Sequence, residues 1–361
     1  MTDADHALPL LPGGGSTVRA LRPTPLSHAA PDRLYFEFTG RGGEYFGIWI
    51  VNLLLTLLTV GIYSAWAKVR RTQYFYRNTN LAGASFDYHG DPWAILKGRL
   101  IVFALLVVYN LAGTFEPLLA LAIFVVIAAV MPILLLRSLR FRAANTSWSG
   151  LRFRFDGDQR GAYRVFLLWP LLTGLTLYLL GPMWHQRLKA YQHNSARFGT
   201  APFAFDASVG AFYGVYLLAF GTVVVAVLIA GALVVGAGHR DPTVMAFLPL
   251  IFIGLFVGIQ PFLMAKLQNL VWNHTGIGPH RFESNVKTGK LAWIVFTNLF
   301  GIIFTLGLFR PFAEIRLARY RIESMTLLAD GPIDDFVAAQ QSAVSATGEG
   351  AADLFDIDIA L

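Results

Sequence analysis

The sequence predicts an all-α integral membrane protein, with seven hydrophobic segments in an A-B-A-B-A internal repeat and short β-ribbons at the membrane face. Three observations support this fold class. Of 361 residues, 55% are hydrophobic and only 14% are charged, whereas an average soluble chain has about 25% charged residues. Seven long apolar runs contain no Asp, Glu, Lys or Arg. Similar motifs recur at the ends of these runs.

The apolar segments are of two kinds. Single segments, called A, begin at Tyr45, Val165 and Leu291, and paired segments, called B, cover Arg99–Leu136 and Val209–Leu263. Several of the runs reach the roughly 20 residues that a helix needs to cross a bilayer. Each A segment can span the membrane, or it can be re-entrant and turn back near a Gly or Pro where protein covers the backbone. The sequence leaves both alternatives open.

The A segments share a pair of residues in the stretch that follows the apolar run. In each copy an Arg stands four positions before a Tyr, a spacing that places both side chains on one face of a helix. These pairs are candidates for contact with a lipid headgroup or another anion. The structural alternative is that the cations extend to the membrane surface beside interfacial aromatic residues. The pairs are Arg70 and Tyr74, Arg187 and Tyr191, and Arg316 and Tyr320.

Two asparagines occupy matching places inside the first and third A segments. Asn52 and Asn298 each lie 22 residues before the Tyr of their segment. An amide in hydrocarbon needs a hydrogen-bond partner. The two residues are therefore candidates for lining a polar cavity, and the alternative is that they join neighbouring helices.

An alternating aromatic stretch precedes every A or B unit. Such alternation predicts a half-buried strand, and in four cases a turn containing Asn and Gly leads into it. We therefore expect short two-stranded ribbons at the membrane face. The stretches are Phe36-Glu37-Phe38, Phe86-Asp87-Tyr88, Phe153-Arg154-Phe155, Phe203-Ala204-Phe205 and Phe282-Glu283-Ser284.

The ends of the chain differ from this pattern. Residues 1–33 mix Pro, Gly, Ala and Thr without hydrophobic periodicity, and residues 335–361 contain no cation. We expect two disordered tails, the second one acidic, around a repeated multi-pass domain at residues 34–334. The first residues also lack the basic and apolar pattern of a cleavable signal peptide.

No catalytic, cofactor-binding or metal site is predicted. The chain has no Cys, and it contains neither a G-x-S-x-G motif nor a phosphate-binding Walker loop. Four histidines lie in or near the turns but lack the spacing of a zinc motif. They are His89, His193, His274 and His280.

A family resemblance rests on three stretches of the chain. The run FTGRGGEYFGIWIVNLLLTLLTVGIYSAWAKVRRTQYFYRNTNLAGASFDY, together with NTSWSGLRFRF and NHTGIGPHRF, resembles the YjgN-like family of bacterial inner-membrane proteins of unassigned function. The resemblance extends over residues 34–334. It implies a multi-pass protein of the cytoplasmic membrane and says nothing about a substrate.

The charge distribution bears on topology and function. If the A segments re-enter, all Lys and Arg residues except Arg240 lie on one side of the membrane, and the positive-inside rule makes that side cytoplasmic. If all seven segments span, the bias is weak. We expect a non-enzymatic protein that forms a transport or small-solute pathway; the alternative is a lipid-interacting or scaffolding protein of the inner leaflet. Membrane lipids are the expected partners, nucleic acid is not, and the oligomeric state is not predicted.

Overall fold

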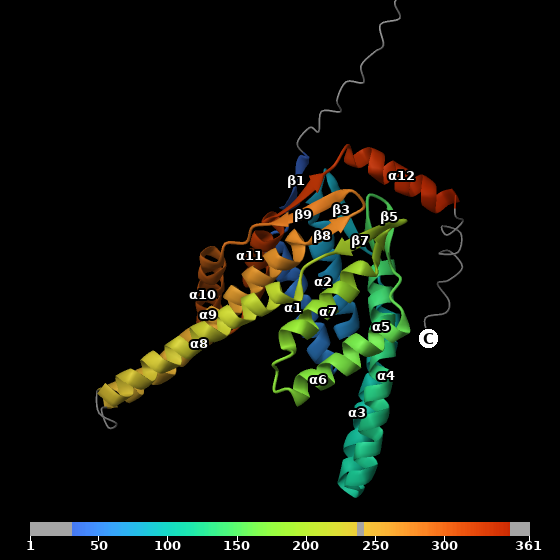
Figure 1. The fold of residues 1–361 in the computed structure, drawn as a ribbon. Helices are drawn as coiled ribbons and strands as arrows, with labels where there is room; N and C mark the ends of the chain where they lie inside the picture. Colours follow the sequence, from blue (N-terminus) through green and yellow to red (C-terminus); the bar gives the residue numbers. More distant parts are fainter. Residues whose placement is uncertain (1–30, 237–241, 347–361) are drawn as a thin grey trace, which may run out of the picture. The chain divides into compact units, whose positions relative to one another are not determined.

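A closed barrel of ten short antiparallel strands organises the protein (Figure 1). The structure, a computed structural model, describes residues 31–236 and 242–346. Around the barrel the strands follow the order β1-β10-β9-β8-β7-β6-β5-β4-β3-β2. Their bounds are β1 Asp32–Phe38, β2 Thr79–Leu81, β3 Ala84–Tyr88, β4 Thr146–Trp148, β5 Leu151–Phe155, β6 Ala196–Phe198, β7 Ala201–Phe205, β8 Thr275–Ile277, β9 His280–Ser284 and β10 Met325–Ala329.

The barrel overturns the predicted fold class. The expectation of an all-α protein with seven hydrophobic segments is wrong, because each expected ribbon continues into the next one. For example, β3 pairs with β4 through Phe86 and Trp148, and β1 closes the circle by pairing with both β2 and β10. Closure leaves no free sheet edge among these strands.

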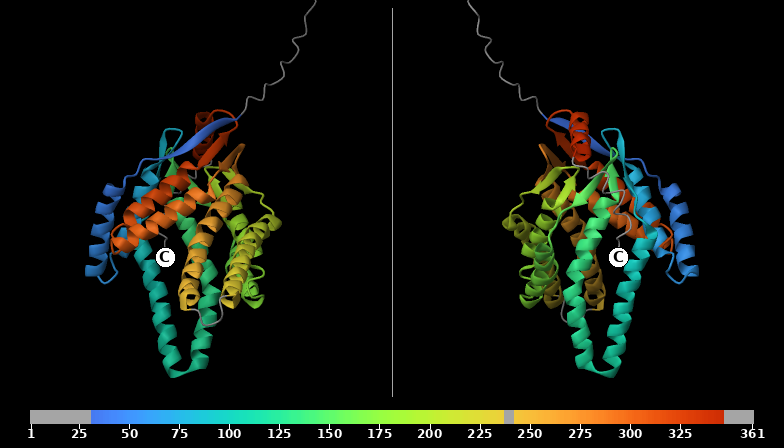
Figure 2. Two further views of the ribbon diagram at one scale, coloured as in Figure 1. Left: turned by 90° about the vertical axis from the view of Figure 1, so that its left-hand side faces the viewer. Right: turned by 90° about the vertical axis from the view of Figure 1, so that its right-hand side faces the viewer.

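Long helical excursions separate the strands and leave the barrel from one end (Figure 2). Consecutive helices contact one another, and α11 contacts α1, so the helices surround a common axis. The bounds are α1 Gly42–Leu58, α2 Ser64–Arg77, α3 Pro92–Phe115, α4 Pro117–Ala144, α5 Gln159–Tyr163, the π-helix η1 Arg164–Leu168, α6 Trp169–Leu175, α7 Gly181–Asn194, α8 Val209–Gly236, α9 Pro242–Asn273, α10 Thr288–Phe304 and α11 Arg310–Glu323.

Three helices in the described part of the chain are long and apolar enough to cross a membrane. They are α3, α4 and, within α8, Val209–Ala232. Helices α1 and α10 are apolar but have 17 residues each. At 1.5 Å per residue they are about 25 Å long, which is short of the roughly 30 Å of a hydrocarbon core.

Each single apolar segment reverses at a tight turn instead of continuing. After α1, Val60 and Gly61 have φ of 50° and 90°, and after α10 Leu306 and Gly307 have φ of 50° and 94°. The N–H of Gly61 donates to the carbonyl of Thr56 at 2.8 Å, the bond of a Schellman helix end. The helix therefore ends where glycine supplies the left-handed conformation, and the polar helix α2 leads back to the barrel.

The middle single segment makes the same reversal without glycine. Leu177 and Tyr178 have φ of 49° and 68°, and the N–H of Tyr178 donates to the carbonyl of Thr173 at 2.8 Å. A non-glycine residue in this conformation costs about 1–2 kcal/mol. The turn thus forms at some conformational cost in this copy.

Aromatic side chains fill the bore of the barrel. One Phe from each odd-numbered strand forms a closed ring, with centroids of neighbouring rings 6.2–6.4 Å apart. The register pairs each of these with a large residue of an even-numbered strand. The ring is Phe36, Phe86, Phe153, Phe203 and Phe282, and the second layer is Leu81, Trp148, Phe198, Ile277 and Leu327. The barrel is consequently a packed core.

A last helix, α12 (Ile333–Ala346), covers the end of the barrel opposite the helical excursions. Phe336 stacks on Phe198 with ring centroids 6.2 Å apart, and Val337 belongs to the barrel core. Gln340 accepts hydrogen bonds from the N–H and hydroxyl of Thr200 at 2.9 and 2.7 Å. This helix occupies the first part of the expected C-terminal tail. The rest of that tail and residues 1–30 lie outside the described residues, so their disorder stays a prediction.

Candidate anion site between the helices

The three predicted tyrosines tie each returning helix to the start of its partner. The hydroxyls of Tyr74, Tyr191 and Tyr320 donate to the carbonyls of residues 33 positions earlier, at 2.9, 2.8 and 3.2 Å. Those carbonyls belong to the residues that cap the N-termini of α1, α5 and α10. Burial, and then the charge of Asp158, raise the pKa of Tyr191 to about 12. The tyrosines therefore position the helices that carry the site.

The three arginines of these pairs are exposed. Arg70 lies over the ring of Tyr63 at 5.8 Å. Arg316 donates to the side-chain oxygens of Asn298 at 2.7 Å and Thr297 at 3.1 Å. Arg70 and Arg316 thus contact side chains of their own hairpins, while Arg187 is exposed on α7. Their predicted contact with a headgroup stays a prediction.

The two predicted asparagines are buried, with 8% of Asn52 and 6% of Asn298 exposed. Besides accepting from Arg316, Asn298 donates to the carbonyl of Ala313 on α11 at 3.1 Å, so it joins the two helices of its hairpin. The side-chain oxygen of Asn52 has no hydrogen-bond partner. Neither residue lines the two pockets described below, and their role in a polar cavity stays a prediction.

Four other cations form two pairs on helices that are not consecutive in the ring of helices. Lys68 and Arg142 are exposed, and Lys189 and Arg321 are half-buried. Lys189 on α7 lies near the charge of Arg321 on α11, and Lys68 on α2 lies near Arg142 on α4. The helices of each pair are not consecutive in the ring of helices, so the fold brings together charges that are distant in the chain. We call Lys68, Arg142, Lys189 and Arg321 the central cations. They lie on α2, α4, α7 and α11, and all except Arg142 are on helices outside the candidate spans.

The surroundings oppose the positive charge of the central cations. Burial, and then the charge of Arg321, lower the pKa of Lys189 below its ordinary value. Burial, followed by Arg99 and Arg142, lowers the pKa of Lys68, and burial lowers that of Arg321. A nearby anion favours the charged form of a cation. Each pair of central cations thus favours the approach of a negatively charged group.

No carboxylate neutralises these residues within residues 31–236 and 242–346. None of the ion pairs there includes a central cation. Glu314 on α11 already accepts from Arg71 and Arg310, both at 3.2 Å. Among the described residues, these cations are therefore open to pairing with an external anion.

Neutral groups hold two of the central cations in place. The guanidinium of Arg321 donates to the side-chain oxygen of Gln268 at 2.6 Å, and the amide of Gln268 donates to the carbonyl of Arg321 at 3.0 Å. Lys189 donates to the side-chain oxygen of Gln192 at 3.4 Å. These bonds orient the cations without removing their charge.

An aromatic layer separates the central cations from the barrel. The ring of His193 stacks on Phe205 at 5.4 Å and meets Trp272 at 5.5 Å, and Trp272 contacts Phe282 of the Phe ring at 5.1 Å. Burial and the charge of Lys189 lower the pKa of His193 to about 4, so its ring is neutral at pH 7. An aromatic layer thus lies between Lys189 and the Phe ring of the barrel.

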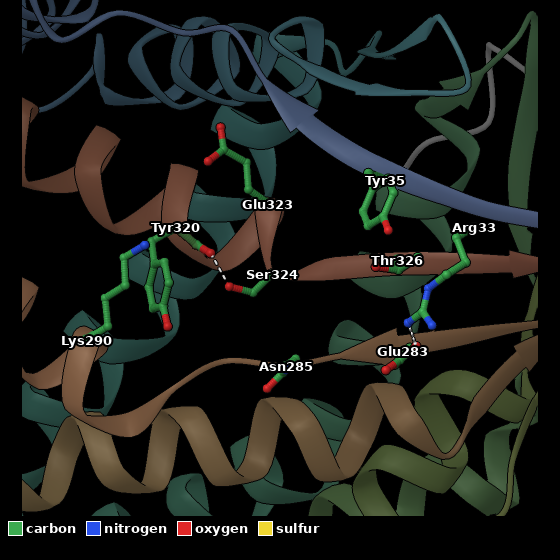
Figure 3. Close-up of a pocket in the computed structure, with 9 residues that line it drawn as sticks. All are labelled: Arg33, Tyr35, Glu283, Asn285, Lys290, Tyr320, Glu323, Ser324 and Thr326. Atoms are coloured by element: carbon green, nitrogen blue, oxygen red, sulfur yellow. Dashed lines mark hydrogen bonds and ion pairs between the residues drawn. The ribbon is translucent and has the colours of Figure 1, made fainter.

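Two pockets are lined by residues other than the central cations. One, of about 370 Å³, opens on the outer wall of the barrel where it meets α10 (Figure 3). The other, of about 340 Å³, lies between α8, α9 and α10 and is mostly apolar. Its lining residues are Ala219, Thr222, Gly254, Gly258, Ile259, Phe262 and Thr288.

The four turn histidines have separate partners. His89 bonds with Ser147 at 2.8 Å, and His274 bonds with the carbonyl of Leu270 at 2.9 Å. His193 faces Thr275, and His280 accepts from the N–H of Asp330 at 3.0 Å. Within the described ranges, no three His, Asp or Glu residues are grouped as metal ligands.

The comparisons with known proteins decide the family. A family model described as "Bacterial protein of unknown function (DUF898)" matches residues 33–354. The chain belongs to this family. It is also similar to the inner membrane protein YjgN of Salmonella typhimurium, with 35% identity over 40% of this chain and 36% of the relative. With YjgN of Escherichia coli O157:H7 the identity is 25%, over 75% of this chain and 58% of the relative.

These comparisons indicate a membrane protein and assign no activity to it. The curated relatives are named inner membrane proteins. The matched region covers 36% of the length of the Salmonella relative and 58% of the length of each Escherichia coli relative. No solved structure matches the chain. Together with the three apolar helices, the relatives support the inner membrane as the location of this protein.

Sequence reasoning missed the central cations. Lys189 stands two residues before its Tyr, whereas Arg321 stands one residue after its Tyr. They therefore occupy different positions relative to the Tyr of their segments. They come near one another only because the helices form a closed ring. In the sequence, these residues could be recognised only as cations on helices with no acidic residue four positions away to pair with them.

Proposed function

We propose that this protein is a multi-pass, non-enzymatic membrane protein that binds anionic phospholipid headgroups of the inner leaflet through its central cations. The observation that carries the proposal is that the two pairs of central cations have no carboxylate partner in the described residues. A phosphate group accepts several charge-assisted hydrogen bonds from Lys and Arg. The apolar helices beside the site would give the acyl chains a matching surface.

The packed barrel favours lipid binding over a solute pathway along the barrel axis. Ten large side chains fill the bore, and α12 covers its far end. A solute would have to displace this core. A ligand that enters from the membrane between the helices meets the central cations without crossing the barrel.

Orientation follows from the same charges. We propose that α3, α4, α8 and α9 cross the membrane, that the three shorter hairpins enter and return, and that the barrel is cytoplasmic. The described cations are concentrated at the barrel end of the helices, and positively charged segments remain on the cytoplasmic side. Short hairpins can keep their turns at membrane depth because neighbouring helices cover them.

Single cysteines test this orientation, since the chain has no native Cys. Exposed barrel-side positions Ser85 and Ser208, changed to Cys, should not react with an impermeant thiol reagent added to intact cells. The exposed Thr114, near the far end of α3, changed to Cys, should react. Permeabilised cells provide the control, because all three positions should then be labelled. Labelling of Ser85→Cys but not of Ser208→Cys would contradict the proposal that all barrel strands lie on the same side of the membrane.

Lipid titration tests the proposed function. The full-length protein in detergent should bind short-chain phosphatidylglycerol more tightly than phosphatidylcholine, and the double variant K189Q/R321Q should bind phosphatidylglycerol about a hundredfold or more weakly than wild type. This estimate assumes one charge-assisted bond of about 1.5–3 kcal/mol lost per cation. Native mass spectrometry or calorimetry measures both affinities.

The matched control is R152Q, which removes an exposed cation from strand β5 of the barrel. It should leave the affinity for phosphatidylglycerol within about twofold of wild type, as expected for an exposed charge. Equal binding of both lipids by the wild type, or an undiminished affinity in a folded double variant, would refute the proposal.

A further inference from the structure

The pocket on the outer wall of the barrel has a composition different from the central cations. Figure 3 shows that its side chains come from β1, the end of β9, the start of α10 and the junction of α11 with β10. Its volume is about 370 Å³. The lining residues are Arg33, Tyr35, Glu283, Asn285, Lys290, Tyr320, Glu323, Ser324 and Thr326.

The formal charges of this pocket balance. Arg33 and Glu283 form an ion pair with each other. Lys290 makes no ion pair within the described ranges, and its ammonium lies over the ring of Tyr320 at 4.8 Å. Glu323 meets Arg319 only at 3.9 Å, with 46% of each side chain exposed. The pocket thus offers one cation and one weakly paired carboxylate to a ligand.

An apolar stripe continues from the pocket along α10. Lys290, Trp293, Phe296, Phe300 and Phe304 follow one another at spacings of three or four, so they lie on one face of the helix. The four aromatic residues are exposed, between 45% and 80%. Their rings contact one another in series, with centroids 6.1, 4.7 and 6.1 Å apart.

This order of groups matches one class of membrane molecule. A tryptophan at the start of an apolar face is typical of the level of lipid headgroups. Above Trp293 the pocket presents a cation and a carboxylate, and below it the stripe presents a surface for hydrocarbon. A phospholipid with a primary amine carries a phosphate for the cation, an ammonium for the carboxylate and acyl chains for the stripe.

We infer that this pocket and the aromatic stripe of α10 form a binding site for an aminophospholipid such as phosphatidylethanolamine. Lys290 binds the phosphate, and Glu323 accepts hydrogen bonds from the ammonium. Phosphatidylcholine has a quaternary ammonium without N–H groups, so it cannot make these bonds. The site is separate from the central cations, which lack a carboxylate and select a net negative charge.

The test compares soluble lipids on the full-length protein in detergent. Calorimetry or native mass spectrometry should show at least fivefold tighter binding of short-chain phosphatidylethanolamine than of phosphatidylcholine. E323Q should remove most of this preference, and K290Q should weaken the binding of phosphatidylethanolamine by fivefold or more. The matched control is K287Q, which removes an exposed cation three residues earlier that does not line the pocket. It should bind as the wild type does.

Two further arms identify the source of the ligand. Glycerophosphoethanolamine, which has the headgroup without acyl chains, should bind at least tenfold more weakly than the lipid, and W293A/F296A should reduce lipid binding without changing that of the soluble headgroup. R321Q should leave phosphatidylethanolamine binding unchanged, which separates this site from the proposed anionic site. Equal affinities for phosphatidylethanolamine and phosphatidylcholine, equal affinities for lipid and soluble headgroup, or unchanged binding in folded K290Q and E323Q would overturn the inference.

Discussion

Replacing Phe198 by Ala should lower the free energy of unfolding by about 3–5 kcal/mol, the usual cost of deleting a buried aromatic ring. The side chain is completely buried. Its ring lies 5.1 Å from Phe153, 5.4 Å from Trp148 and 6.2 Å from Phe336, measured between centroids. One substitution therefore removes contacts with two barrel strands and with α12 together. Neighbouring aromatic rings are too rigid to fill the space that remains.

Denaturant unfolding in detergent, followed by tryptophan fluorescence, measures this loss. Phe115→Ala is the matched control, because the same ring at the end of α3 is 83% exposed. It should change the free energy of unfolding by less than about 1 kcal/mol. A loss of similar size in both variants would mean that the barrel does not contain the main core of the protein.

Acidification should destabilise the protein between about pH 6.5 and pH 4. Burial and the charge of Lys189 lower the pKa of His193 to about 4 in the folded state, whereas an unfolded chain has a histidine pKa near 6.5. In this interval the unfolded chain binds a proton that the folded protein excludes. The free energy of unfolding therefore falls as the pH falls. The difference between these two pKa values corresponds to a change of at most about 3 kcal/mol in the free energy of unfolding. Burial also lowers the pKa of His280, which adds to the effect in the same direction.

His193→Gln isolates this contribution. Glutamine does not titrate, so the free energy of unfolding of the variant should vary less with pH between 6.5 and 4 than that of wild type. The difference is measured by denaturant unfolding at several pH values and constant ionic strength. His89→Gln, at an exposed position, is the control and should keep the wild-type slope. An identical slope in His193→Gln and wild type would show that His193 titrates normally in the folded protein.

The sequence revealed half of the barrel strands. Four of the five odd-numbered strands have two aromatic residues around a small or charged one, as in Phe153-Arg154-Phe155, and this alternation identified them. The fifth, Phe282-Glu283-Ser284, keeps only the first aromatic residue of the pattern. Four of the five even-numbered strands contain three residues, for example β6 (Ala196–Phe198), and three residues are too few to distinguish a strand from a turn. The closure of the barrel depends on pairs such as Asp32 and Ala329, which no local pattern can indicate.

The candidate sites were predicted unevenly for a related reason. Tyr74, Tyr191 and Tyr320 were found because they recur at one place in each copy, and the structure explains the recurrence by one hydrogen bond made three times. A residue that recurs at the same place in all three segments can be recognised from the sequence alone. The central cations differ between copies and become a site only when the fold brings Lys189 on α7 near Arg321 on α11.

The pairing of β1 with β10 has a consequence for biosynthesis. The ribosome makes β1 before the helical excursions and β10 after them. Each hairpin can enter the membrane as it appears, because its contacts are local in the chain. The sheet cannot become a circle until Met325–Ala329 has been made. Until then β1 and β9 each expose an unpaired edge, which another chain could join. Synthesis of β10 therefore completes the barrel, and a nascent chain that stalls before β10 would be the form most prone to misassembly.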